Sequence, residues 1–110
     1  MQKTSLTALA RQELQAATRA ASGRSAKTVY GGHEHQLRQT LIALRAGRSL
    51  AEHANPGEAT VHVLSGRVLL RSGNDSWSGW VNDLIILPGG VHSLEAIEDS
   101  AVLLTVVKTR

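Results

Sequence analysis

The chain has 110 residues, a formal net charge of +3 and no cysteine. This length suffices for one hydrophobic core, and the absence of cysteine excludes disulfides, thiolate catalysis and cysteine-ligated zinc. Aromatic residues make up only 3% of the sequence, so Leu, Val, Ile and Ala must fill the core. No apolar run approaches the roughly 18 residues of a membrane span, and charges interrupt the N-terminal segment. The sequence therefore favours a cytoplasmic protein with no membrane partner.

Charge is distributed unevenly along the chain. Residues 1–48 contain eight Lys and Arg against two Glu, a balance of +6, whereas residues 49–110 contain four against seven acidic residues, a balance of −3. The basic residues are scattered and no binding motif accompanies them, which argues against a nucleic-acid partner. We expect instead a basic N-terminal arm that packs on an acidic barrel of the same chain or of a second copy.

Residues 5–21 have the pattern of a helix. Apolar residues recur at helical spacing, Ser5 is a suitable N-cap, and Gly23 suits the end of the helix. The apolar stripe is narrow and rich in alanine, so we expect a helix that docks on another unit. The predicted division is an N-terminal helix and arm, residues 1–24, followed by a barrel, residues 25–110.

The rest of the chain has the pattern of an all-β domain, because short apolar segments alternate with turns rich in Gly, Pro, Asn and Asp. The predicted strands are residues 26–30, 35–45, 49–55, 59–64, 67–71, 84–87, 91–96 and 101–107. Residues 72–79 are predicted as a loop, whose Trp77, together with Trp80, is expected to cover the end of a sheet. Many short strands separated by such turns are typical of a sandwich or barrel.

A spaced set of residues around a Pro-Gly turn carries the most specific signal. The spacing is Gly47-x5-His53-x-Asn55-x3-Ala59-x6-Gly66. It resembles the first motif of the cupin family, Gly-x5-His-x-His-x3-Glu-x6-Gly. Both glycines and the first histidine match, whereas Asn55 and Ala59 replace the second histidine and the glutamate.

A second stretch, NDLIILPGGVHSLEA, resembles the second cupin motif, Gly-x5-Pro-x-Gly-x2-His-x3-Asn. Pro88 and Gly90 match the motif. Asn82 replaces the first glycine, which fits because Asn tolerates left-handed backbone better than most residues. His92 arrives one residue early, and Ala96 replaces the final Asn.

The resemblance implies a cupin-type double-stranded β-helix, or jelly-roll barrel, which is often dimeric and has its ligand pocket in the barrel mouth. Metal-binding cupins hold iron, manganese, nickel, copper or zinc with three His and one Glu. Residues two apart on a strand share a face, so positions 53 and 55 are predicted to face inward, with 59 across the hairpin. The candidate pocket residues are His53, Asn55, Ala59 and His92.

The candidate metal ligands are His53 and His92, with Asn55 as a weak carbonyl ligand. Two imidazoles and an amide provide too few ligands and no compensating negative charge. A divalent transition metal (Zn, Ni, Cu, Fe or Mn) would therefore be held only weakly.

Three other histidines are weaker candidates. His33 and His35 lie two residues apart and are alternative metal ligands, although an exposed strand start after a Gly-Gly turn explains them more simply. His62 has the opposite parity from positions 59, 61 and 63, so it is predicted to face outward or into a subunit interface.

These observations leave three functions open. The first is a small-molecule binding or sensing protein with at most a weak metal site. The second is a metal-dependent enzyme of the dioxygenase, isomerase or lyase type that uses His53, His92 and a third ligand not identified from the sequence. The third is a metal-free, sugar-epimerase-like enzyme, which ranks last because no carboxylate of matching parity orients a pocket histidine. A homodimer is expected in each case.

Overall fold

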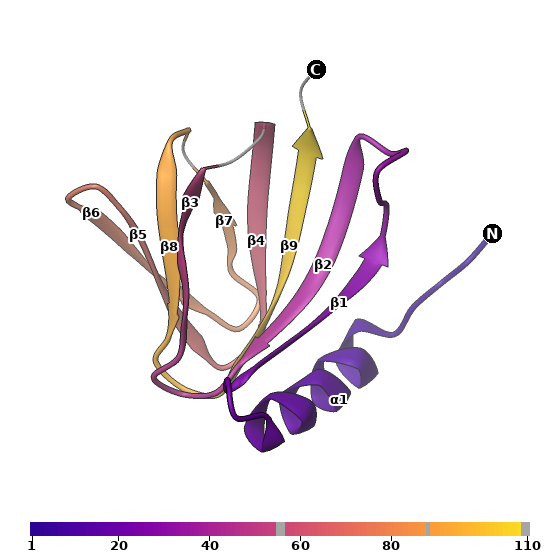
Figure 1. Ribbon diagram of the computed structural model, residues 1–110, viewed down its shortest axis with the longest axis horizontal. Helices are drawn as coiled ribbons and strands as arrows, with labels where there is room; N and C mark the ends of the chain where they lie inside the picture. Colours follow the sequence, from indigo (N-terminus) through magenta and orange to yellow (C-terminus); the bar gives the residue numbers. More distant parts are fainter. Residues whose placement is uncertain (55–56, 88, 109–110) are drawn as a thin grey trace.

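The computed structural model describes residues 1–54, 57–87 and 89–108, and for residues 51–54 it describes the backbone. In this part of the chain one helix, α1 (Leu6–Arg19), precedes nine strands (Figure 1). The strands are β1 (Arg24–Tyr30), β2 (Leu37–Leu44), β3 (Ser49–Ala54), β4 (Gly57–Ser65), β5 (Arg67–Ser72), β6 (Asp75–Trp80), β7 (Leu84–Ile86), β8 (Val91–Ala96) and β9 (Ser100–Lys108).

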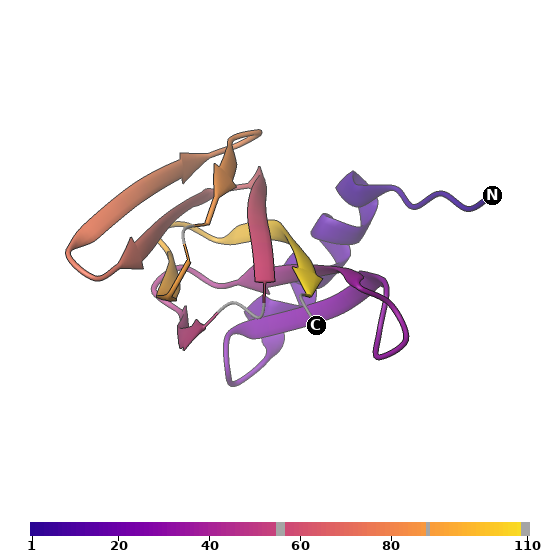
Figure 2. The same ribbon diagram turned by 90° about the horizontal axis from the view of Figure 1, so that it is seen from above.

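The strands form two antiparallel sheets that face each other (Figure 2). The order is β1-β2-β9-β4-β7 in the five-stranded sheet and β3-β8-β5-β6 in the four-stranded sheet. In Figure 1 the sheets converge at the lower end, where β2 ends and β9 begins, and diverge at the upper end, where β3 ends and β8 begins. We call these the closed end and the open end. The arrangement confirms the predicted all-β jelly-roll barrel with an N-terminal helix.

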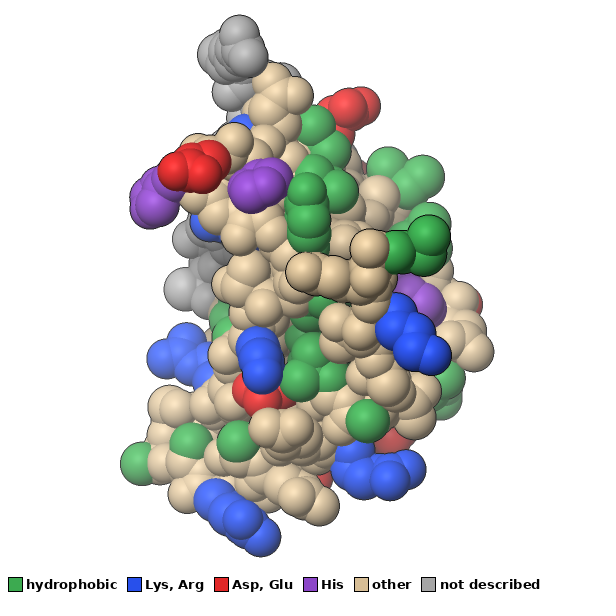
Figure 3. Space-filling view, turned by 90° about the vertical axis from the view of Figure 1, so that its right-hand side faces the viewer, with side chains coloured by type: hydrophobic (Ala, Val, Ile, Leu, Met, Phe, Trp, Pro, Cys, Tyr) green, Lys and Arg blue, Asp and Glu red, His purple; other side chains and the backbone are tan. Residues whose placement is uncertain are grey.

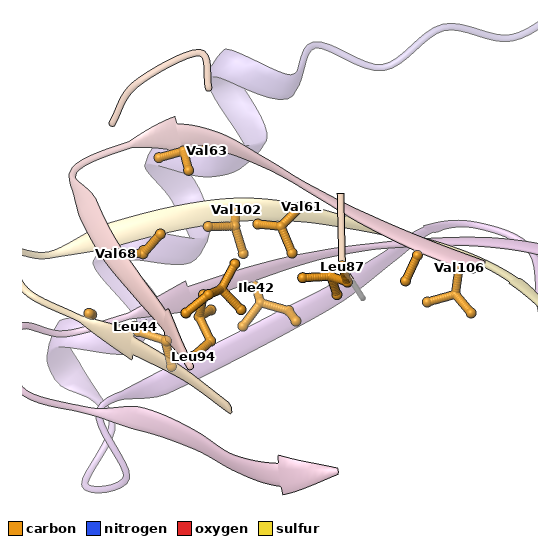
Figure 4. Packing of buried hydrophobic residues seen from close by; sticks show 12 residues of the cluster. Ile42, Leu44, Val61, Val63, Val68, Leu87, Leu94, Val102 and Val106 are labelled. Carbon is orange, nitrogen blue, oxygen red and sulfur yellow. The ribbon is translucent and has the colours of Figure 1, made fainter. Parts of the chain in front are cut away.

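Alternating side chains fill the space between the sheets, as the twofold repeat of a strand requires. On β4, Ala59, Val61 and Val63 are buried and the residues between them are more exposed. Figure 4 shows this cluster in the barrel interior. Its buried members are Ile42, Leu44, Ala59, Val61, Val63, Val68, Leu70, Leu87, Leu94, Ala96, Val102 and Val106.

Helix α1 covers the outer face of the five-stranded sheet near the closed end (Figure 1). Ser5 caps it by accepting a hydrogen bond from the Ala8 N–H at 3.2 Å, as predicted. Its narrow apolar face packs Leu9 on Leu41 of the sheet. The side chain of Glu13, on the same helix, is also buried and accepts a hydrogen bond from the Ser25 hydroxyl at 2.6 Å.

The main error of the sequence prediction lies in residues 72–79, which are not a single loop. Residues 75–80 form β6, and the pairing of Ser72 with Asp75 leaves a two-residue turn at Gly73 and Asn74. Gly73 has φ +59°, the left-handed backbone that such a turn requires. The strand escaped prediction because its many polar residues lack the alternation of a half-buried strand. Among the described residues, no helix is long and apolar enough to cross a membrane.

Candidate functional site

The buried imidazole of His92 is the central polar feature of the barrel interior. Along β8, His92, Leu94 and Ala96 are buried, whereas Val91 and Ser93 are more exposed. His92 is only 3% exposed, which is rare for a polar side chain in the described part of this protein. A neutral imidazole carries one donor and one acceptor nitrogen, so it can bind a polar group of a ligand.

A small cavity of about 20 Å³ adjoins His92. Residues from both sheets form its described lining, and apart from His92 all of them are apolar: Ile42, Leu50, Val61, Leu70, Leu87, Leu94, Val102 and Leu104. A volume of this size holds about one water-sized group. The interior therefore admits one small group of a ligand, next to a single imidazole.

The backbone register brings His53 opposite His92. Strand β3 pairs with β8 so that Leu50 opposes Leu94, and an extra residue on β3 then shifts the register before His53 opposes His92. Without this irregularity Glu52 would take that place. Directly opposite residues of an antiparallel pair share a face, with Cβ atoms about 4.5–5.5 Å apart. The irregularity on β3 therefore compensates for the early position of His92 in its motif.

The replaced motif positions provide little toward a metal site. Ala59 lies on the interior face of β4 with 4% exposure, and its carbonyl accepts a hydrogen bond from the Leu87 N–H at 3.0 Å. Its methyl group offers no ligand atom where the motif has a carboxylate. Asn55 and Pro88, from the two motifs, lie outside the described residues.

Potential metal ligands are sparse among the described residues of the barrel. In the ranges that the structure describes, no group of three or more His, Asp or Glu side chains lies close enough together to hold an ion. The backbone register places residue 53 opposite His92, and structural zinc sites usually have four ligands. The described residues therefore do not fit a tightly held transition metal.

The remaining histidines lie away from this interior. His33 and His35 occupy the loop between β1 and β2 and are exposed, and the ring of His35 meets Tyr30 edge-on at 5.1 Å. His62 has the outward parity that was predicted, and its Nε2 lies 3.4 Å from Oδ1 of Asn82. Asn82 has φ +70°, which confirms the left-handed turn predicted for it.

A groove of about 330 Å³ opens beside the cavity, and the sequence analysis missed it. We call it the side groove, and its described lining is Arg24, Ser25, Ala26, Thr40, Ile42 and Leu50. It runs along the inner face of β1 and β2, where the four-stranded sheet does not cover them. The signal was present in the sequence, because positions 24, 26 and 28 share a face, but only the register shows that this face is the inner one.

Comparison with known proteins identifies the fold. No protein-family model and no curated protein matches the sequence. Among solved structures, a conserved protein of unknown function from Streptococcus pyogenes is 27% identical, with a TM-score of 0.73, over 83% of this chain and 79% of that chain. A cupin superfamily protein from Desulfitobacterium hafniense has a TM-score of 0.72 at 13% identity, over 78% of each chain.

A third similar structure is an acetylacetone dioxygenase from Acinetobacter johnsonii. It is 17% identical, with a TM-score of 0.67, over 77% of this chain and 60% of that chain. A sequence identity this low is evidence for a shared fold only. Together with the two antiparallel sheets, these likenesses establish that the chain is a small cupin-fold domain, an RmlC-like jelly-roll barrel with one N-terminal helix.

Proposed function

We propose that this domain binds or senses a small organic molecule in the barrel, at His92, without a tightly held metal. The observation that carries the proposal is a buried imidazole in the wall of an otherwise apolar cavity. Apolar pockets with a few convergent polar groups are the usual form of small-molecule sites.

The ligand has an apolar part and at least one oxygen. The cavity beside His92 has room for about one water-sized group, such as a methyl or a carbonyl oxygen. The imidazole binds the oxygen, and the rest of the ligand extends toward the open end or the side groove. Burial of the apolar part provides most of the affinity, at about 25 cal/mol per Å².

The alternative function is a metal-dependent enzyme that uses His53 and His92 with a third ligand. The backbone register that pairs these two residues supports it. Ala59 counts against it, because the motif's carboxylate would otherwise offset the charge of the cation. We rank it second for this reason.

One titration separates the two functions. Chelator-treated protein is titrated with 1-hexanol and with acetylacetone, and the imidazole resonances of His92 are followed by NMR. We expect at least one probe to shift them without metal. His33, His35 and His62 serve as internal controls, since they lie outside the interior and should not respond.

Two results would overturn the first function. One is that none of 1-hexanol, acetylacetone and the carboxylate hexanoate shifts His92. The other is that a shift appears only after zinc or nickel is added and that citrate fails to remove the metal, which supports the enzyme instead.

We also expect a homodimer. Strands β1 and β7 lie at the two edges of the five-stranded sheet, and edge strands must be paired, covered or protected by charge. Sedimentation at micromolar concentration should give twice the monomer mass. A monomer mass at that concentration contradicts the expectation.

A further inference from the structure

The side groove adjoins the cavity beside His92, with which it shares part of its lining. Ile42 and Leu50 line both of them. Leu50 opposes Leu94 on β8, and His92 lies two residues before Leu94 on that strand. Residues two apart on a strand have Cα atoms about 7 Å apart. The described residues between the side groove and His92 are therefore apolar.

Arg24 lies on the inner side of edge strand β1, at the rim of the side groove. It opposes Leu44 of β2, whose side chain belongs to the barrel core. Lys27 on the same strand opposes Leu41, which instead packs against helix α1. The two cations of β1 are therefore on opposite faces of the sheet, and Arg24 alone lines the groove.

The electrostatics of the side groove favour an anion. The described lining of the groove and of the cavity contains no Asp or Glu. Among the described residues, the one ion pair joins Arg71 to Glu95, so no carboxylate in that part of the chain pairs with Arg24. Arg38 adds a second cation on this inner face, because it opposes Val106 of the core.

We infer that the ligand of this domain is a small carboxylate with an apolar body. The carboxylate binds the guanidinium of Arg24, which presents paired N–H donors of matching geometry. The apolar body lies over Ile42 and Leu50 and points toward His92. This inference rests on the proposed function, since it specifies the ligand of the same site.

A structural role for Arg24 is the competing explanation. An inward-pointing charge on an edge strand prevents that strand from pairing with other chains, whatever ligand the domain binds. If Arg24 has only this role, a charged and an uncharged ligand of the same length should bind with similar affinity. If Arg24 binds the ligand, the anionic ligand should bind more tightly.

The test compares hexanoate, 1-hexanol and hexylamine, which share a six-carbon chain and differ in charge. Their affinities are measured by NMR titration on the His92 resonances, for the wild type and for Arg24→Gln. In the wild type we expect hexanoate to bind about tenfold more tightly than 1-hexanol, and hexylamine to bind more weakly than either. In Arg24→Gln we expect hexanoate to fall to the affinity of 1-hexanol, with 1-hexanol unchanged.

Two further variants serve as controls. Lys27→Gln removes the same charge from the other face of β1 and should leave all three affinities unchanged. Arg24→Lys keeps the charge but loses the paired donors, so it should bind hexanoate more weakly than the wild type and more tightly than Arg24→Gln. Both sites are exposed, so unfolding curves of the variants should superimpose on the wild type.

The inference is overturned if hexanoate binds no more tightly than 1-hexanol, or if Arg24→Gln affects both equally. It is also overturned if Lys27→Gln has the same effect as Arg24→Gln, because net charge would then suffice. These results leave the proposed function standing when 1-hexanol still shifts His92. If 1-hexanol, acetylacetone and hexanoate all fail to shift His92, the proposed function fails as well.

Discussion

The closed and open ends of the barrel share the same strands, but different residues fill them. At the closed end Leu44, Val63 and Val68 are at most 1% exposed, whereas Leu87 and Val106 toward the open end are 8% and 5% exposed. Figure 4 shows the two sets at opposite ends of the cluster. The difference in exposed area is small, but the more exposed end is the one at which Leu87 lines the cavity.

Polar groups follow the same division. At the closed end the Ser100 hydroxyl accepts a hydrogen bond from the Arg67 N–H at 3.0 Å and lies 2.7 Å from the carbonyl oxygen of Glu98. At the open end His92 faces an apolar cavity and Ala59 takes the place of a motif carboxylate. The comparison indicates that packing is tighter at the closed end than toward the open end, where the cavity beside His92 lies.

The same substitution at the two ends tests this division most strongly. Leu44→Ala should lower the free energy of unfolding by about 4 kcal/mol, because a fully enclosed cavity remains. Leu87→Ala should cost only about 2 kcal/mol, because it enlarges a cavity that already exists beside His92. Urea denaturation gives both values.

Ligand binding should respond in the opposite order. Leu87→Ala should raise the affinity for 1-hexanol, since it adds room next to the imidazole, and Leu44→Ala should leave that affinity unchanged. Equal losses of stability, or a change in affinity from Leu44→Ala, would show that the two ends are not independent.

Two glycines of the first motif allow the energetic cost of backbone strain to be distinguished from the cost of a steric clash. Gly66 has φ +79°, and a Cβ atom there would collide with the backbone oxygen of Asp99 and with Ser100. Gly47 has φ +86°, but a Cβ atom there would meet nothing within 4 Å. Gly66→Ala should cost about 3 kcal/mol and Gly47→Ala about 1 kcal/mol, so thermal denaturation should rank them clearly. Equal costs would mean that the tight approach at the closed end relaxes freely.

Restoring the motif ligands should turn the open end into a metal site. The double variant Asn55→His, Ala59→Glu adds an imidazole and a carboxylate to the motif that contains His53. We expect the affinity for zinc to rise at least about a hundredfold over a weakly binding wild type, as measured by calorimetry. Without zinc the variant should be less stable than the wild type, because position 59 is buried.

The matched control is Asn55→His with Ala59→Gln, which has the same shape without the negative charge and should gain much less. Tight zinc binding by the wild type would contradict the proposed function, and His33 and His35 would then be the first residues to mutate. No gain in the double variant would mean that the barrel interior differs from a cupin metal site.

The sequence predicted the fold well where glycine and proline turns punctuate apolar segments. The parity of positions 59, 61 and 63 predicted the buried face of β4, which the structure confirms. The predicted hairpin, with position 59 across from position 53, is wrong, because β3 pairs with β8 in one sheet and β4 pairs with β7 and β9 in the other. Strand β6 was missed because its stability comes from pairing with β5, and Gly79, packed closely against Val63 and Ile85, has no side chain that would reveal a buried position.

The candidate site was less predictable, because it depends on register. The extra residue on β3 that brings His53 opposite His92 has no sequence signature of its own. Likewise, a lone Arg24 at the start of a strand resembles any solvated charge. Its place on the inner face follows only from its pairing with Leu44. Its exposure there follows because the four-stranded sheet does not cover edge strand β1.

The smallest expected effect concerns the helix that covers the closed end. Ser5→Ala removes the oxygen that accepts the hydrogen bond from the Ala8 N–H, and should lower the free energy of unfolding by about 1 kcal/mol. Ser5→Asp keeps the cap and adds a negative charge to a first turn that has no acidic residue, so it should be at least as stable as the wild type. Thr4→Ala is the control, because Thr4 is an exposed neighbour outside the helix and its loss should change stability by less than about 0.5 kcal/mol. Because α1 packs outside the barrel, all three variants should bind 1-hexanol as the wild type does, and weaker binding by Ser5→Ala would show that the helix and the ligand site are coupled.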